Sequence, residues 1–327
     1  MENNKGISVI VPCYNDQATL KLCLDAIVAN QYPDCEIIVV DDNSKDSSLA
    51  IARSYDAQVI SSGENLGAGW ARTHGASFAS KDILLFIDAD IIIPGDFLRR
   101  ISQKFSGGTS DVIMGVMDKE PCNRGFMASL LALEANFYHS CKDTAIDEVH
   151  TFSFAIRRSV FSASGGFSST FRGAGGEEYE FGYKLTNKGC VLKVDPKLKV
   201  GHYFDSFFKR TVKLFRRSVN WFYVFAKQRR FGVKGTSLRV GLGKVFGSLF
   251  LITLAMSALK PQPFIYISLI VFIIELLLLS NFFYFIYKEK GTWFLLRAVF
   301  ILQFWSLVVV VGVIVGFLQI LFKSRKL

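Results

Sequence analysis

Short apolar runs alternate with amphipathic stretches over the first part of the chain. The runs at 7–12, 36–41 and 83–88 are largely apolar rather than alternating, which is typical of strands covered on both faces. The stretches between these runs have the spacing of apolar residues expected of helices. Strands that alternate with helices in this way predict an α/β fold, with a mostly parallel sheet flanked by helices.

The pattern changes beyond residue 240, where long apolar stretches replace the alternation. Segments 264–287 and 293–322 each contain a single charged residue and reach the length of about 20 residues that crosses a bilayer. A third segment, 245–259, is shorter and stops before a lysine and a proline. We therefore expect a transmembrane region over 240–327 with two or three helices, in a multi-pass protein of the cell (inner) membrane.

Residues 205–239 form a basic belt between these two parts, with ten basic side chains and one acidic one. Apolar residues recur at helical spacing in this belt, at Phe208, Val212, Phe215, Val219 and Phe222. This spacing predicts an amphipathic helix in a membrane interface, where each Lys or Arg near anionic lipids contributes about 1 kcal/mol. The alternative is that the belt is the positively charged border of the first span, and both interpretations can hold together.

The net charge of +10 is spread unevenly along the chain. Residues 1–204 carry −5, the basic belt carries +9 and residues 240–327 carry +6. A uniform globule and a disordered chain are both excluded by this division. We expect no nucleic-acid partner, because the belt adjoins membrane spans and the front of the chain is acidic.

Six cysteines occur without a C-x-x-C pair and without the spacing of metal ligands. We expect reduced, packed thiols in a cytosolic compartment. The first residues lead directly into a strand-like run and lack the apolar region of a secretory signal. The domain at 1–204 is therefore expected on the cytoplasmic side.

Polar residues follow the ends of three predicted strands. They are Tyr14 and Asn15, Asp42 and Asn43, and Asp88 and Asp90. Ligands of open α/β sheets bind outside the carboxyl ends of the strands, so the three clusters predict one site. Along an extended chain Asp88 and Asp90 lie on the same side and can share Mg²⁺ or Mn²⁺, cations that bind through carboxylates together with substrate phosphates.

The order of the motifs is more specific than any single one of them. They are VPCYN at 11–15, VVDDNSKD at 39–46, ENLGAGWARTHGA at 64–76, FIDAD at 86–90, SGGF at 164–167, GGEEYEFGYKLTNKGC at 175–190 and VGHY at 200–203. Over residues 6–203 this set resembles the family 2 glycosyltransferases of the GT-A fold. The resemblance implies metal-assisted, inverting transfer of a sugar from a nucleotide-sugar.

The resemblance also implies roles for single residues. The residues implied to bind the nucleotide-sugar are Pro12, Tyr14, Asp42, Arg72 and Asp88. The Tyr14 ring would stack on the base, Asp42 would accept from a ring N–H, and Arg72 would reach the diphosphate. The alternatives are that Asp42 caps the helix that begins near Asp46 and that Arg72 is a plain surface arginine. The resemblance implies Asp90 as a direct ligand of the metal ion, with Asp88 and His202 as further metal-binding residues.

Glu177 and Glu178 match the family's Gly-Glu-Asp element, with Glu in place of Asp at the second position. Inverting transfer to a hydroxyl needs a base, and the resemblance implies Glu178 as that base and Glu177 in acceptor binding. The alternative is an acidic first turn of a helix, favoured by the helix dipole. A phosphate acceptor requires no base.

The membrane segments predict an acceptor carried by a lipid. Processive synthases have a Gln-x-x-Arg-Trp element that residues 217–221 and 228–231 do not match, so we expect transfer of one sugar. The expected reaction uses a UDP-sugar and a polyprenyl phosphate or lipid-linked glycan in cell-envelope glycan synthesis. The alternatives are a GDP-mannose-type polyprenyl-phosphate sugar synthase and a catalytically inactive membrane scaffold.

Overall fold

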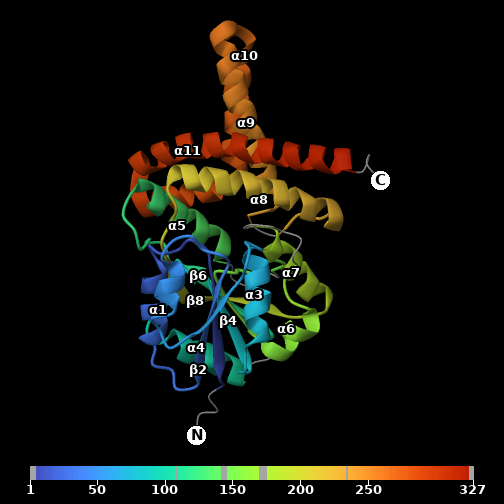
Figure 1. Cartoon of the computed structure of the whole chain (residues 1–327). Helices are drawn as coiled ribbons and strands as arrows, with labels where there is room; N and C mark the ends of the chain where they lie inside the picture. Colours follow the sequence, from blue (N-terminus) through green and yellow to red (C-terminus); the bar gives the residue numbers. More distant parts are fainter. Residues whose placement is uncertain (1–4, 108–109, 141–145, 169–174, 233–234, 324–327) are drawn as a thin grey trace. The chain divides into compact units, whose positions relative to one another are not determined.

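The structure, a computed structural model, describes residues 5–107, 110–140, 146–168, 175–232 and 235–323 (Figure 1). The chain divides into two compact units, Met1–Phe204 and Asp205–Leu327, called here the N-terminal and C-terminal units. Gly173 and Ala174, which precede the predicted base in the sequence, lie outside the described residues.

The N-terminal unit is built on a mixed, mostly parallel sheet with the strand order β3-β2-β1-β4-β7-β6-β8-β5. The strands are β1 (Ile7–Cys13), β2 (Cys35–Asp41), β3 (Gln58–Ser61), β4 (Ile83–Ile87), β5 (Ile91–Ile92), β6 (Val112–Met117), β7 (Ser153–Arg157) and β8 (Leu192–His202). The first four run parallel, as do β6 and β8, whereas β7 is antiparallel to β4 and β6. The predicted fold class is confirmed.

Helices cover both faces of this sheet (Figure 1). They are α1 (Leu20–Val28), α2 (Ser48–Ala52), α3 (Ala68–Ser77), α4 (Phe97–Gly107), α5 (Phe126–His139), α6 (Arg158–Ser164) and α7 (Glu177–Asn187). Val9 belongs to the apolar core with α1 and α4, while the next residue, Ile10, belongs to the core with α6 and α7. Because successive strand residues point to opposite faces, a strand covered on both faces must be apolar throughout.

The strand registers bring the predicted polar clusters to one edge of the sheet. Cys13 lies opposite Asp41 in the β1–β2 pair, and Ile10 lies opposite Phe86 in the β1–β4 pair. The residues that follow β1, β2 and β4 therefore leave the sheet at neighbouring carboxyl ends, where ligands of such sheets bind.

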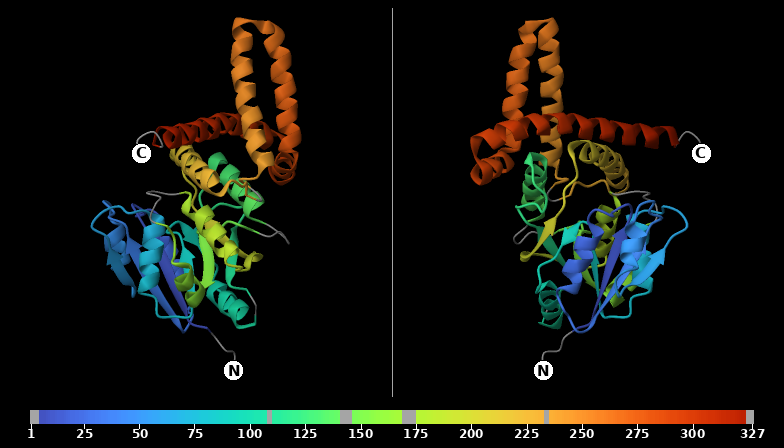
Figure 2. Two further views of the ribbon diagram at one scale, coloured as in Figure 1. Left: turned by 90° about the vertical axis from the view of Figure 1, so that its right-hand side faces the viewer. Right: turned by 60° about the vertical axis from the view of Figure 1, so that its left-hand side comes forward.

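The C-terminal unit consists, in its described residues, of helices α8 (Phe207–Gln228), α9 (Leu238–Leu259), α10 (Pro261–Leu278) and α11 (Ser280–Lys323). Three of them, α9, α10 and α11, are long and apolar enough to cross a membrane, which indicates membrane association. Helices α9 and α10 lie side by side as a hairpin (Figure 2). Helix α11 is divided at Gly291, whose φ of 80° is not helical.

The helix expected over 264–287 ends earlier, at Leu278. The guanidinium of Arg239 donates a 2.6 Å hydrogen bond to the Leu278 carbonyl, one of the groups that lack a partner at a helix end. The next side chain, Leu279, fills the space beside Gly243, where an added Cβ would lie 2.7 Å from a Leu279 methyl. Hydropathy does not reveal this break, because apolar residues continue on both sides of it.

The segment expected over 245–259 is longer than predicted and begins at Leu238. Ser237 is its N-cap, and the Ser237 hydroxyl accepts a hydrogen bond from the Val240 amide. The cap lies within the residues assigned above to the basic belt, so the last part of the belt belongs to this helix. The segment expected over 293–322 is the part of α11 that follows its division.

Helix α8 is the amphipathic helix predicted in the basic belt, and Phe215, Val219 and Phe222 of its apolar stripe pack against α11. Gly312 and Gly316 allow this close contact, since a Cβ on Gly316 would lie 2.9 Å from the Val219 carbonyl oxygen. Small residues four apart commonly let membrane helices approach in this way. Phe208, at the start of the stripe, is 79% exposed, so its ring is free to contact lipid.

Candidate active site

Pro12 and Tyr14 lie at the carboxyl end of β1, beside the predicted site. Pro12 is buried in the strand opposite Val40, and the chain then carries Tyr14 past the sheet edge, where its side chain is 46% exposed. An exposed aromatic ring at this edge can stack on a nucleotide base. Stacking of Tyr14 on a base stays a prediction.

The Asp42 carboxylate is buried at the end of β2 and holds the turn that precedes α3. Its two oxygens accept hydrogen bonds from the Leu66 amide at 2.8 Å and the Gly67 amide at 2.7 Å. Neither bond caps the helix that begins near Asp46, which was the structural alternative. A carboxylate offers about four lone-pair sites, so contact with a base stays compatible with these bonds.

Asn15, Ser44 and Lys45, which received no individual role from the sequence, join the loop after β1 to the loop after β2. The Asn15 side chain accepts from the Lys45 amide at 2.8 Å, and the Asn15 amide donates to the Ser44 hydroxyl at 2.9 Å. Asn15 adopts a φ of 56°, a left-handed conformation that asparagine tolerates better than most residues. The polar residues directly after two parallel strands were the only local signal for this link.

Asp88 and Asp90 do not continue the strand as the alternation predicts. The Ile91 amide donates to the Asp88 carbonyl at 3.0 Å, which closes a tight turn. The Asp88 carboxylate then accepts from Arg72 at 2.6 Å, whereas that of Asp90 lies 3.2 Å from the imidazole of His202. The two carboxylates therefore have different partners.

Asp90 and His202 meet because β5 pairs with β8. Ile91 lies opposite His202, and the Tyr203 amide donates to the Asp90 carbonyl at 3.0 Å. The described residues contain no group of three or more His, Cys, Asp or Glu side chains arranged as a metal site. A carboxylate and an imidazole form half of a site, which fits a cation completed by phosphate oxygens of the substrate.

Arg72 lies inside the N-terminal unit, and its guanidinium forks between Asp88 and Glu177. The distances are 2.6 Å to Asp88 and 3.4 Å to Glu177, and the Arg72 side chain is only 4% exposed. Burial opposes its charge, but the neighbouring carboxylates of Asp88 and Glu177 outweigh this and raise the pKa of Arg72 above its usual value. The expected diphosphate contact is therefore replaced, in this structure, by two ion pairs.

Glu177 and Glu178 begin α7, and both are buried. Each carboxylate accepts a backbone amide, from Gly175 at 2.9 Å for Glu177 and from Gly176 at 2.8 Å for Glu178. Gly175 and Gly176 have φ values of 105° and 107°, which favour glycine. The two amide hydrogen bonds hold both carboxylates in defined positions at the start of the helix.

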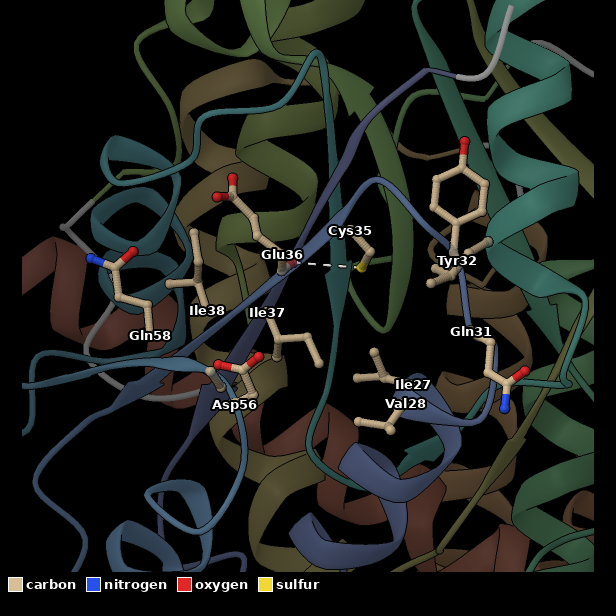
Figure 3. A pocket seen from close by; sticks show the side chains of 12 residues that line it. Ile27, Val28, Gln31, Tyr32, Cys35, Glu36, Ile37, Ile38, Asp56 and Gln58 are labelled. Carbon is tan, nitrogen blue, oxygen red and sulfur yellow. Dashed lines mark hydrogen bonds between the residues drawn. The ribbon is translucent and has the colours of Figure 1, made fainter. Parts of the chain in front are cut away.

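A separate hollow of about 390 Å³ lies at the other end of the sheet. Figure 3 shows the side chains that line it. Its walls come from the end of α1 and the first residues of β2 and β3, including Tyr32, Glu36 and Gln58. These are the amino ends of parallel strands, whereas Asp42 and Asp88 follow carboxyl ends. The hollow is therefore not part of the candidate active site.

Known proteins similar to this chain include glycosyltransferases. Residues 8–165 match the family model described as Glycosyl transferase family 2. The glycosyltransferase AglE of Haloferax volcanii is 26% identical over 215 residues, which cover 62% of this chain and 71% of AglE. The glycosyltransferase GlyA of Streptococcus pneumoniae is 34% identical over 113 residues, which cover 33% of this chain and 16% of GlyA.

A solved structure of similar fold spans both units of the chain. It is the mannosyltransferase PcManGT from Pyrobaculum calidifontis in complex with GDP-Man and Mn²⁺, with a TM-score of 0.60 and 17% sequence identity. The similarity covers 96% of this chain and 88% of PcManGT. The family match identifies a glycosyltransferase domain of family 2 in this chain, and the similarity of fold shows that this domain has the GT-A fold and is followed by long apolar helices.

Proposed function

We propose that the protein transfers a single sugar, with inversion, from a nucleotide-sugar to a membrane-associated acceptor such as a polyprenyl phosphate or a lipid-linked glycan. One observation carries this proposal. Arg72 joins Asp88, at the donor edge, to Glu177, beside the predicted base, so the groups for the two substrates adjoin one another. A displacement at the anomeric carbon needs donor and acceptor groups in this proximity.

The donor site would consist of Tyr14 against the base, Asp42 at a ring N–H and Asp88 near the ribose or sugar. Asp90 and His202 would hold Mg²⁺ or Mn²⁺, since their donor atoms already face one another at 3.2 Å. The cation would neutralise charge on the leaving diphosphate. Pro12 supports this edge from within β1.

Glu178 would take the proton of an acceptor hydroxyl as that hydroxyl attacks. Its carboxylate is oriented by the Gly176 amide at 2.8 Å and lies in the first turn of α7. A phosphate acceptor arrives as an anion and needs no such base. The nature of the acceptor therefore decides how much of the rate depends on Glu178.

The apolar helices support an acceptor carried by a lipid in the cell (inner) membrane, with the N-terminal unit on the cytoplasmic side. The basic belt would contact anionic headgroups through Lys209, Lys213 and Arg216, which are exposed on α8. Such a position brings the enzyme to its acceptor and suits a step in cell-envelope glycan synthesis.

We favour a UDP-sugar as the donor, with a GDP-sugar as the second candidate. PcManGT binds GDP-Man, and its fold matches 96% of this chain, which supports the second candidate. An inactive membrane scaffold is disfavoured because the carboxylates of Asp90 and Glu178 are both present and held in order.

Thermal unfolding of the full chain in detergent, with UDP or GDP and with or without Mn²⁺, tests the donor site. A ligand that binds only the folded protein raises the unfolding temperature according to its concentration over Kd. We expect stabilisation by UDP that requires Mn²⁺ and is lost in Asp42→Ala. A larger shift with GDP would select the second candidate, and no shift with either nucleotide would contradict the donor site.

A further inference from the structure

We propose that Arg72 is a positioning residue, which couples the donor-side carboxylate of Asp88 to the acceptor-side carboxylate of Glu177 and so holds the Glu178 carboxylate in place. The inference rests on the proposed function of Glu178 as the base. It assigns Arg72 a role through other side chains in place of the diphosphate contact implied by the resemblance.

The packing of α3 against the start of α7 brings Arg72 to this position. A Cβ added to Gly69 would lie 3.2 Å from the Ser168 carbonyl and 3.4 Å from the Glu177 Cβ, so the two helices approach closely here. Arg72 follows Gly69 by three residues and therefore lies on the same face of α3. Its guanidinium also lies over the Phe167 ring, 5.7 Å from the centroid.

The charges in this region depend on one another because most of them are buried. Arg72 and Glu177 are each 4% exposed, and Asp88 is 30% exposed. A buried charge is costly unless it is paired, and removal of one partner leaves the other uncompensated. Without the guanidinium, the Glu177 carboxylate would lose this ion pair and would shift towards its remaining contacts or towards water. Either change alters the start of α7.

The Glu177 carboxylate transmits this constraint to the backbone. One of its oxygens meets Arg72, and the other accepts from the Gly175 amide at 2.9 Å. The next amide, that of Gly176, donates to Glu178 at 2.8 Å. Arg72 thus reaches the Glu178 carboxylate through Glu177 and two peptide groups, without touching the reacting atoms.

Both ion pairs use the forked geometry of the guanidinium. One terminal nitrogen faces Asp88 and the other faces Glu177, while the Nε has no hydrogen-bond partner among the described residues. A lysine ammonium is a single point charge on a flexible stem and cannot hold this planar bridge. Arg72→Lys should therefore keep the charge and lose most of the positioning.

Steady-state kinetics with a lipid-linked glycan, whose acceptor group is a hydroxyl, and UDP binding of Arg72→Met and Arg72→Lys test the role in the full-length protein. We expect kcat to fall by about 100-fold in Arg72→Met, as for a misplacement of about 1 Å, and by about 10-fold in Arg72→Lys. The Kd for UDP should change by less than about threefold in both variants. A Kd raised more than about tenfold, with kcat near wild type at saturating donor, would overturn the proposal in favour of a diphosphate contact.

A double-mutant cycle of unfolding free energies measures the coupling of Arg72 to Glu177 without an activity assay. Urea unfolding of Arg72→Met, Glu177→Gln and the double variant should be strongly non-additive, with the double variant more stable than Arg72→Met alone because Glu177 no longer brings a buried charge that has lost its ion pair. Additive losses would overturn the coupling of Arg72 to Glu177. Failure of the proposed function is a separate outcome, seen as a wild type that releases no nucleoside diphosphate.

Discussion

The imidazole Nε2 of His202 lies 3.2 Å from a carboxylate oxygen of Asp90. Pairing of β5 with β8 creates this contact, since Ile91 lies opposite His202. The two side chains thus offer one nitrogen and at least one oxygen to a single cation, beside the turn that carries Asp88. A divalent cation bound there would adjoin the expected diphosphate.

Asp90→Asn should therefore abolish the metal dependence of the reaction. We expect turnover to fall by about 100-fold or more, because the charge that neutralises the leaving group is no longer held. Electron paramagnetic resonance of Mn²⁺ measures binding independently of turnover. Asp96→Asn is the matched control, since Asp96 pairs with Arg100 on the surface of the unit. Unchanged Mn²⁺ binding in Asp90→Asn would exclude this metal site.

Glu178→Gln should separate hydroxyl acceptors from phosphate acceptors. With a lipid-linked glycan as acceptor, we expect kcat to drop by about 10²- to 10⁴-fold, as for loss of a general base. With a polyprenyl phosphate the drop should be small, because no proton needs to be removed. UDP binding is the control and should be unchanged. Full activity on a hydroxyl acceptor would rule out Glu178 as the base.

The meeting of the polar residues after β1 and β2 at one edge of the sheet could be predicted from sequence because its signals are local. The apolar strands, the polar residues directly after them and the order of the motifs all lie within short segments, and parallel pairing brings Tyr14 and Asp42 to one edge. The turn at Asp88 could not be predicted in this way. It is closed by the Ile91 amide, which makes local backbone geometry differ from the alternation of an extended strand.

The partners of Arg72 depend on contacts distant in sequence. Arg72 and Glu177 are separated by 105 residues, and their contact exists only once α7 packs against α3. The break after Leu278 was also not predictable from hydropathy, and the residues that contact it, Arg239 and Gly243, lie on another helix. Both features arise from tertiary packing, which a single-sequence pattern does not contain.

Gly312→Leu should destabilise the C-terminal unit. An added Cβ would lie 2.8 Å from the Ser218 Cβ and 2.9 Å from the Phe215 carbonyl, so α8 would have to move away from α11. Overpacking of this kind costs about 1–3 kcal/mol. Thermal unfolding in detergent measures the loss, with Val311→Leu at the neighbouring exposed position as control. Equal stability of the two variants would contradict the packing of α8 on α11.

His150 should make the N-terminal unit less stable in acid. Burial lowers the pKa of His150 to about 4, although its Nδ1 lies 3.2 Å from the Gly115 carbonyl, whereas an unfolded histidine titrates near 6.5. Between pH 6.5 and pH 4, His150 therefore binds a proton in the unfolded chain but not in the folded unit. Stability should be lost as the pH falls from 6.5 towards 4, by up to about 3 kcal/mol.

Urea unfolding of the full chain at pH 7 and pH 4.5 measures this dependence. His150→Gln should reduce the difference in unfolding free energy between the two pH values, because the group that titrates differently in the two states is gone. His74→Gln, at a partly exposed histidine, is the control and should keep the wild-type difference. An identical difference in all three proteins would exclude His150 as its source.

Release of nucleoside diphosphate by the full-length protein, reconstituted in anionic vesicles with polyprenyl phosphate or a lipid-linked glycan, tests the proposed activity most directly. A panel of UDP- and GDP-sugars with Mn²⁺ should identify one donor whose cleavage requires both the lipid acceptor and the metal. Asp90→Asn should lose this release. No release with any donor, or release that is unaffected by Asp90→Asn and by omission of Mn²⁺, would contradict metal-assisted transfer of a sugar to a membrane acceptor.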